Sequence, residues 1–430
     1  MSTSFLDVAD RIGARLCRDS IWWGPRCNWI GGYQDNSPAV VHQALGPDLF
    51  RGTSGIALSL FNVWAATGEQ LFLKTAAGAL AHSLSRAAPG RVGFYTGLAG
   101  LCHSALRAAA ITRQEMYWDE ALRIGGMIPA EDPNADIVSG SAGCITPLIS
   151  LYRHSKTDTF LQLAIEHGRS LVDRAQRQDT GWSWKTLPTA PRAMPCYSLG
   201  VAGIATALLE LFEATGEESF RHAGAEGFRY IRNTYDATEE NWRDYRVLNV
   251  EMPDGTLKPM FSTSWCHGAA GIGLAHLRAG ELLGESSYRE KTDAAMRTVT
   301  RTVRRSLSQM NFSLSHGAAG MAELMLCAGS ESPEHISLAR QVGELGIQQY
   351  EDDRISWPCG GFGGIETPDL MLGLAGIACF YLRLHDPNLV PSVLLVVPEG
   401  HGTSGDTETD QWADSDLAAI PLGVAGMASH

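Results

Sequence analysis

Two similar phrases in the sequence hold the residues best suited to chemistry. The first is SWCHGAAGIG at 264–273 and the second is SLSHGAAGMA at 313–322. Cys266 and His316 are residue types whose sulfur and nitrogen atoms can bind a metal. Ser315 stands in the second phrase where the first has Cys266. The phrases are therefore either structural turns or part of a metal site that lacks one ligand.

The same phrase recurs along the chain, and the structural units that it marks must position Cys266 and His316. A glycine pair of the form G-x-x-G, followed by small and apolar residues, occurs seven times, with first glycines at 52, 97, 140, 200, 268, 317 and 373. After each pair the apolar residues fall at helical spacing, and runs end at glycines such as Gly68 and Gly216. A second helical pattern follows, so each unit predicts a helical hairpin. The glycines are explained by tight turns and close helix packing.

Seven related hairpins can either stack in a line or close into a ring. A linear stack needs polar capping repeats, but the first and last copies here are as apolar as the middle ones. We therefore predict an all-α fold, an α/α toroid of seven helical hairpins. In such a ring the residues just before each glycine pair would gather around one mouth of the central cavity.

The rest of the chain is assigned around this ring. We expect residues 1–395 to form a single toroid domain and residues 396–430, which are polar and acidic, to form a flexible C-terminal tail. The stretch 235–261 alternates around a PDG turn and predicts a small β-hairpin insertion near the mouth. The aromatic and proline-rich stretch 179–198 suits a lid or a peptide-contact loop.

Composition narrows the function classes. The chain has 34 basic and 47 acidic residues, a net charge of −13, which disfavours nucleic acid and anionic membranes as partners. No apolar stretch is long enough for a membrane span and the N-terminus has no signal-peptide pattern, so a cytoplasmic protein is expected. The nine cysteines form no CxxC pair and no regular disulfide framework, as expected in a reducing compartment.

The motifs together resemble the lanthionine synthetase C-like (LanC) family of lanthipeptide cyclases. The resemblance rests on the sevenfold glycine pattern, RCNWIG from Arg26, WCHG at 265–268, SHG at 315–317 and TPDLMLGLAG from Thr367, and it spans roughly residues 20–395. It implies a zinc-dependent enzyme that adds a peptide cysteine thiol to dehydroalanine or dehydrobutyrine and so forms a thioether ring. It also implies a dehydrated precursor peptide as substrate, and a stand-alone subunit that works with a separate dehydratase or other modification enzyme.

The resemblance assigns roles to individual residues. It implies Cys266 and His316 as zinc ligands, with Ser315 in the third ligand position, and Asp136 in DIVSG as a catalytic residue. Asp136 has a second interpretation, as a helix N-cap. The family's histidine before the fourth glycine pair is replaced by Leu199. His267 and Cys359 are the two alternatives for the missing ligand.

Three hypotheses follow from these residues. The first is a lanthipeptide cyclase with a depleted or rearranged metal site. The alternative is a catalytically depleted scaffold that binds a precursor peptide or a partner modification enzyme. A third is addition of a free thiol, such as glutathione, to dehydro-residues.

Overall fold

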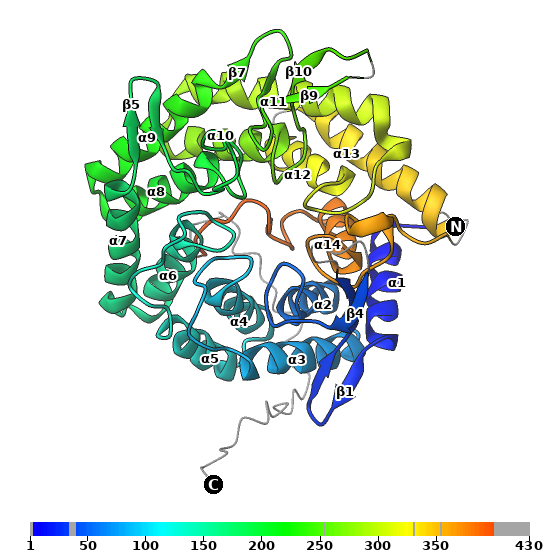
Figure 1. Cartoon of the computed structure of the whole chain (residues 1–430). Coiled ribbons are helices and arrows are strands. Elements are labelled where there is room, and N and C mark those ends of the chain that lie inside the picture. The colour runs from blue at the N-terminus through cyan, green and yellow to red at the C-terminus, as the bar shows by residue number, and fades with distance from the viewer. Residues whose placement is uncertain (1–2, 34–39, 253, 330–331, 353–354, 400–430) are drawn as a thin grey trace.

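The computed structural model describes residues 3–33, 40–252, 254–329, 332–352 and 355–399, and within these ranges the chain is mostly helical. Seven helices begin directly after the first glycine of a pair and form an inner ring: α2 (Thr53–Thr67), α4 (Leu98–Thr112), α6 (Ser141–Ser155), α8 (Val201–Thr215), α10 (Ala269–Leu283), α12 (Ala318–Ala328) and α14 (Leu374–His385). Seven more surround them: α1 (Phe5–Arg18), α3 (Gln70–Ser85), α5 (Glu115–Gly125), α7 (Asp158–Asp173), α9 (Glu218–Asn233), α11 (Ser286–Ser306) and α13 (Pro333–Gly346). Figure 1 looks along the axis of this double ring.

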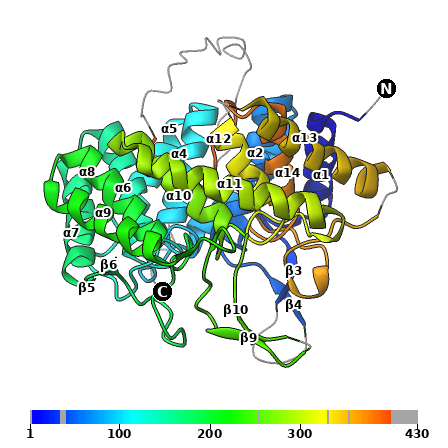
Figure 2. The same cartoon turned by 90° about the horizontal axis from the view of Figure 1, so that it is seen from above.

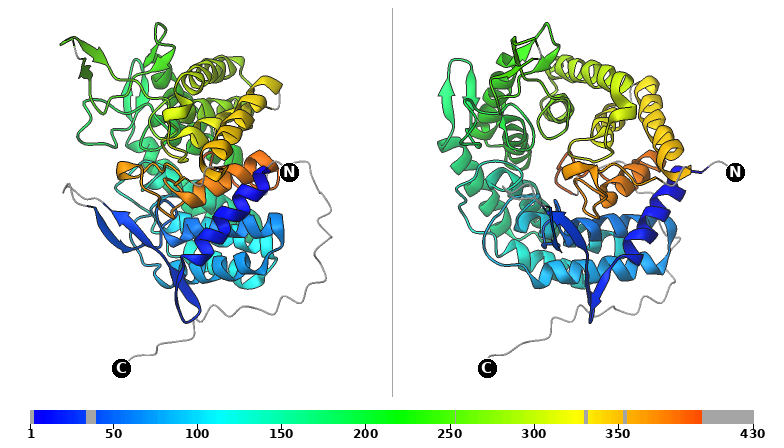
Figure 3. Two further views of the ribbon diagram at one scale, coloured as in Figure 1. Left: turned by 90° about the vertical axis from the view of Figure 1, so that its right-hand side faces the viewer. Right: turned by 45° about the vertical axis from the view of Figure 1, so that its right-hand side comes forward.

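Residue patterning explains the two layers. Inner helices are apolar on nearly every side, and in α8 every residue from Val201 to Leu211 is buried. Such a helix is stable only where neighbours cover it all round. Outer helices other than α3 are amphipathic, and α9 buries one stripe while its charged residues face outward. The all-α toroid with seven hairpins is therefore confirmed, and the two layers are also seen in Figure 3.

The seventh hairpin is made from the two ends of the chain. Each of the first six inner helices packs on the outer helix that follows it, but α14 packs on α1. Ring centroids of Phe5 on α1 and Tyr381 on α14 lie 6.0 Å apart, and Ile12 and Val8 are fully buried. Because α14 also contacts α2 and α12, the inner ring is closed. The N-terminal helix thus completes the toroid.

The described segment after α14, residues 386–399, crosses the middle of the ring (Figure 1). Its backbone accepts hydrogen bonds from Tyr95 Oη at Val393 O, 2.7 Å, and from Trp265 Nε1 at Leu394 O, 2.9 Å. Residues 393–396 are buried, although the sequence assigned the tail from 396. The remainder of the predicted tail, 400–430, lies outside the described residues and stays a prediction.

Short antiparallel hairpins project from one face of the ring (Figure 2). In the predicted insertion there are two, β7 (Tyr235–Asp236) with β8 (Asn241–Trp242), and β9 (Asn249–Glu251) with β10 (Leu257–Pro259). Three further hairpins were not predicted: β1 (Ile21–Trp23) with β2 (Arg26–Asn28), β3 (Ile30–Tyr33) with β4 (Val41–Ala44), and β5 (Gln176–Gln178) with β6 (Gly181–Ser183). Within the described residues no helix has the length and apolar character needed to cross a membrane.

Candidate functional site

The seven glycine turns share one geometry. A Cβ on the second glycine of each pair would meet the carbonyl oxygen six residues earlier, at distances from 1.8 Å for Gly320 to 2.3 Å for Gly55. No side chain tolerates such a contact, so each inner helix can begin there only with glycine. The packing explanation of the repeat is confirmed.

A side chain four residues before the first glycine caps each of five turns. It accepts a hydrogen bond from the backbone N–H just before that glycine, with distances of 2.8 Å for Asp48 and Arg51, 2.8 Å for Asp136 and Ser139, 3.4 Å for Ser264 and His267, 3.2 Å for Ser313 and His316, and 2.8 Å for Asp369 and Leu372. These bonds hold the residue before the glycine in place. His267 and His316 therefore occupy equivalent, fixed positions on two turns.

Backbone hydrogen bonds connect neighbouring turns around the mouth. They join the residues two positions before each first glycine, running from N–H to carbonyl: Phe50 to Tyr95, Tyr95 to Val138, Ser198 to Cys266, Cys266 to Ser315, Ser315 to Met371 and Met371 to Phe50. Cys266 N lies 3.3 Å from Ser315 O. The two phrases that opened the sequence analysis are therefore direct neighbours in space.

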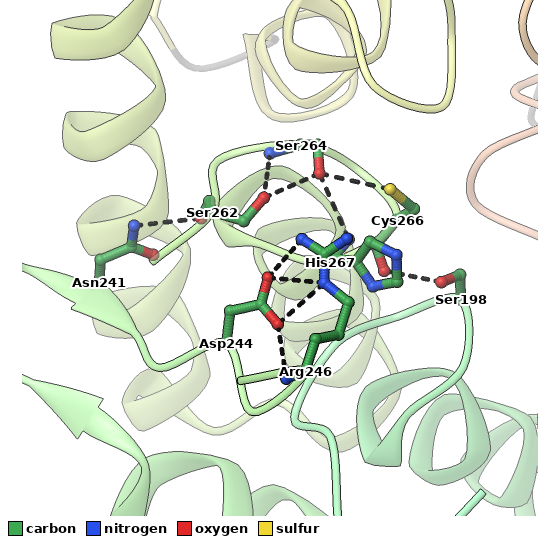
Figure 4. Close-up of polar contacts among 8 residues, drawn as sticks. All are labelled: Ser198, Asn241, Asp244, Arg246, Ser262, Ser264, Cys266 and His267. Carbon is green, nitrogen blue, oxygen red and sulfur yellow. Dashed lines mark hydrogen bonds and ion pairs between the residues drawn. The ribbon is translucent and has the colours of Figure 1, made fainter. Parts of the chain in front are cut away.

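The buried Cys266 thiol lies close to a serine hydroxyl of its own turn (Figure 4). Its Sγ is 3.4 Å from Ser264 Oγ, and its carbonyl oxygen accepts a 2.7 Å hydrogen bond from Ser198 Oγ. Burial raises the pKa of this thiol, partly opposed by the Ser264 and Ser315 hydroxyls. Although the Ser315 hydroxyl lies near the sulfur, no well-aligned hydrogen bond forms, and Ser315 Oγ has no partner within the described residues.

Two imidazoles lie on this turn and on the neighbouring one. His316 is exposed at the mouth, and His267 is half-buried with its Nδ1 lacking a hydrogen-bond partner in the described part of the chain. Desolvation, then the nearby Arg246 guanidinium, lowers the pKa of both side chains, that of His267 to about 4. Both rings are therefore mainly neutral at pH 7, and the lowered pKa makes each of them a weaker base than a free imidazole.

An arginine and an aspartate from the insertion complete the site. Asp244 is fully buried and binds Arg246 through Nη2–Oδ2 and Nε–Oδ2 contacts of 2.6 and 3.0 Å. Figure 4 shows the Arg246 side chain between Asp244 and the His267 ring. Sequence analysis missed this pair, because it lies outside the repeat. The only signal was the charged WRDYR segment before the predicted hairpin.

Asp136 lies in the third turn, two turns before the one that carries Cys266. The Asp136 side chain is buried, and its Oδ1 and Oδ2 atoms each lie 3.2 Å from the Ser139 hydroxyl, in addition to the backbone contact already described. Burial raises the pKa of this carboxyl, and the Ser139 contacts oppose the shift. The helix N-cap position itself is Gly140, so Asp136 caps the preceding turn. A catalytic role for Asp136 stays a prediction.

The described side chains do not fit a zinc ion in this arrangement. No group of three or more His, Cys, Asp or Glu side chains in the described ranges is placed to hold a metal. Cys359, one alternative ligand, is buried near Glu366 and Asp369 before α14, and Leu199 is half-buried at the fourth turn. Zinc binding by Cys266 and His316 stays a prediction, and no step below depends on it.

The fold and the site define a closed α/α toroid whose chemistry-bearing residues lie on the turns before its inner helices. A model of the family described as lanthionine synthetase C-like protein matches residues 43–395. Since this match covers most of the chain, the chain belongs to the lanthionine synthetase C-like family.

Two similar proteins extend this finding. The lacticin 481/lactococcin biosynthesis protein LcnDR2 of Lactococcus lactis subsp. lactis is 21% identical over 380 residues, which cover 83% of this chain. The chain spans only 38% of the length of that relative. Among solved structures, a nisin cyclase superposes with a TM-score of 0.61 at 14% identity, covering 81% of this chain and 91% of its own. This last similarity concerns the fold.

Proposed function

We propose that this chain closes thioether rings in a dehydrated precursor peptide. The observation that carries the proposal is that Cys266 and His316, implied as functional by the family resemblance, lie on hydrogen-bonded neighbouring turns at one mouth. The biosynthetic relative and the cyclase neighbour support the same substrate class. A separate dehydratase as partner is also part of this proposal.

The reaction adds the S–H group of a peptide cysteine across the Cα=Cβ bond of a dehydro-residue. Sulfur bonds to Cβ, the π electrons move toward the carbonyl as an enolate, and a proton is added to Cα. Atoms and electrons balance without an oxidant or reductant. A thiol is mostly protonated at neutral pH, so a nearby base is needed. The pKa of about 4 makes His267 a poor base for this step, so His316, whose ring is exposed on the neighbouring turn, is the candidate to take the thiol proton and return it to Cα.

Thiol counting on a dehydrated peptide tests the proposal. Ring closure leaves the peptide mass unchanged but removes a free thiol, so fewer sites react with a maleimide in mass spectrometry. We expect wild-type protein to remove thiols, and His316→Ala, which removes the proposed base, to slow this at least tenfold. His222→Ala, an exposed histidine on α9, is the matched control and keeps the wild-type rate. A peptide that gains the mass of an added small thiol would indicate the free-thiol reaction instead.

A second function is favoured by the depleted ligand set. Ser315 and Leu199 occupy two positions where the resemblance implies functional side chains, and the described residues offer no metal cluster. These observations suit a scaffold that binds a precursor peptide or a modification enzyme. If wild-type protein leaves every thiol free with or without added zinc, yet binds the peptide as tightly as Cys266→Ala does, the scaffold replaces the cyclase.

A further inference from the structure

We propose that Arg246, oriented by Asp244, is the anion-binding residue of this site and supplies the positive charge that the family resemblance assigns to zinc. The inference rests on the proposed function, since the anions concerned are the peptide thiolate and the enolate that follows its addition. In the resting protein, Arg246 is then expected to attract anions to this site and to disfavour a divalent cation there.

The position of Arg246 is fixed by the segment that leads into the Cys266 turn. Asp244 N donates to Met260 O at 2.8 Å, and Arg243 forms a β-bridge with Phe261. Asp244 is enclosed, and Arg246 N and Nε each lie 3.1 Å from its Oδ1. The arginine is therefore held by a carboxylate that solvent cannot reach.

The guanidinium keeps donors for a ligand. Asp244 occupies Nε and Nη2, while Nη1 makes no hydrogen bond to the described residues. The Arg246 side chain remains 36% exposed, so solvent and small anions can reach it. On the two neighbouring turns, the buried Ser315 Oγ and His267 Nδ1 lack hydrogen-bond partners within the described ranges.

Electrostatics argues against a metal at the same place. The Arg246 guanidinium lies beside the His267 ring, on the turn that also carries Cys266 (Figure 4). Asp244 is bound to Arg246, so its oxygens are not available as ligands. A zinc ion would have only Cys266 and His316 as ligands, with a serine in the third position and a positive charge nearby. A thiolate would instead meet the N–H donors of a guanidinium that is already held in place.

Selective labelling of Cys266 tests the positive charge without requiring ring closure. Iodoacetate is anionic and iodoacetamide is neutral, and peptide mapping gives the rate of each at Cys266. We expect Arg246→Gln to lower the iodoacetate-to-iodoacetamide rate ratio about fivefold or more, and Arg246→Lys to restore most of it. Arg243→Gln is the control, because Arg243 pairs with Asp236 at the surface. A ratio that Arg246→Gln leaves unchanged would overturn the inference.

Metal analysis provides the second arm. After dialysis against zinc, wild-type protein is expected to retain far less than one ion per chain. The double variant Ser315→Cys/Arg246→Gln, which adds a thiolate and removes the guanidinium, is expected to bind zinc at least tenfold more tightly than Ser315→Cys alone. Stoichiometric zinc in the wild type that is lost in Cys266→Ala would overturn the inference.

Thiol counting links the inference to the reaction. With a chelator present, we expect the wild type to keep its rate, Arg246→Gln to lose about a hundredfold, and Arg243→Gln to lose nothing. If the wild type closes no ring, the proposed function fails while the labelling and metal arms still decide the role of Arg246. Circular dichroism of each variant confirms folding, and Arg246→Lys serves if Arg246→Gln does not fold.

Discussion

Asp136 illustrates how the same residue spacing can reflect structure. The D-x-x-x-G phrase that attracted attention at Asp136 also occurs at Asp48 and Asp369, and all three carboxylates cap their turns by the same 2.8 Å contact. Ser264 and Ser313 do the same with hydroxyls. The acceptor is therefore a general requirement of the turn, which one copy viewed in isolation does not reveal.

Substitution at position 136 should separate capping from catalysis. Asparagine keeps an oxygen acceptor for Ser139, so Asp136→Asn should lower the free energy of unfolding by less than about 0.5 kcal/mol, whereas Asp136→Ala should cost about 1–3 kcal/mol. Urea denaturation measures both. Equal losses in the two variants would show that the Ser139 contact does not stabilise the turn.

A catalytic role at the same position makes a different prediction. If the carboxyl takes part in the reaction, Asp136→Asn should slow thiol addition about a hundredfold while leaving stability unchanged. Asp369→Asn, the matching change in the seventh turn, should keep its rate per folded molecule. Similar rates in the two variants would leave Asp136 with its structural role alone.

Residues inside the repeat could be predicted from the sequence, and those outside it could not. The glycine phrase placed Cys266 and His316 on equivalent turns because equivalent residues of a ring must meet at one mouth. Arg246 belongs to an insertion without a repeat, and its position depends on the bridge between Arg243 and Phe261. Such a pairing depends on tertiary packing, which local pattern does not encode.

At the level of elements, the inner helices were predictable because glycine and apolar periodicity agree. Short strand pairs such as β5 with β6 were missed, since three-residue strands give too little alternation to detect. The pairing of α14 with α1 was missed for another reason. In a repeat read along the chain, each inner helix pairs with the outer helix that follows it. No outer helix is described after α14, so this rule gives α14 no partner.

The second glycine of each pair should be intolerant of any side chain. Gly320→Ala would place Cβ 1.8 Å from Leu314 O at the start of α12, and we expect a loss on the order of 3 kcal/mol or more, or insoluble protein. Gly126→Ala is the control, because its nearest neighbour is 3.5 Å away and its φ is −68°. This second change should shift stability by about 1 kcal/mol or less. A tolerated Gly320→Ala would mean that the turn is not fixed as described.

At the scale of the whole molecule, a buried histidine makes stability depend on pH. His276 on α10 is fully buried among Phe228, Trp242 and Tyr288, with Nδ1 2.9 Å from Ile272 O. Burial lowers the pKa of His276 to about 4, below its value of 6.5 in the unfolded chain. The folded state therefore favours the neutral ring. Its contribution is fully present above pH 6.5 and is lost as pH falls toward 4.

The size of this effect can be measured. Between pH 7 and pH 5 the imidazole of His276 becomes protonated in the unfolded chain but stays neutral in the folded one. This difference lowers the free energy of unfolding by about 2 kcal/mol over that range. We expect His276→Phe to remove that part of the pH dependence in urea titrations. His222→Phe, at an exposed position, should leave the pH dependence as in the wild type. Identical slopes for wild type and His276→Phe would contradict the assignment.

The contact between α1 and α14 has a consequence for how the chain is made. The helix α1 meets its partner α14 only after the twelve helices between them have been translated. Until then, the nascent chain exposes the apolar face of α1, and the ring formed by the earlier hairpins stays open. Synthesis speed and chaperone cover at this late stage should therefore govern the yield of closed rings more than any property of the finished molecule.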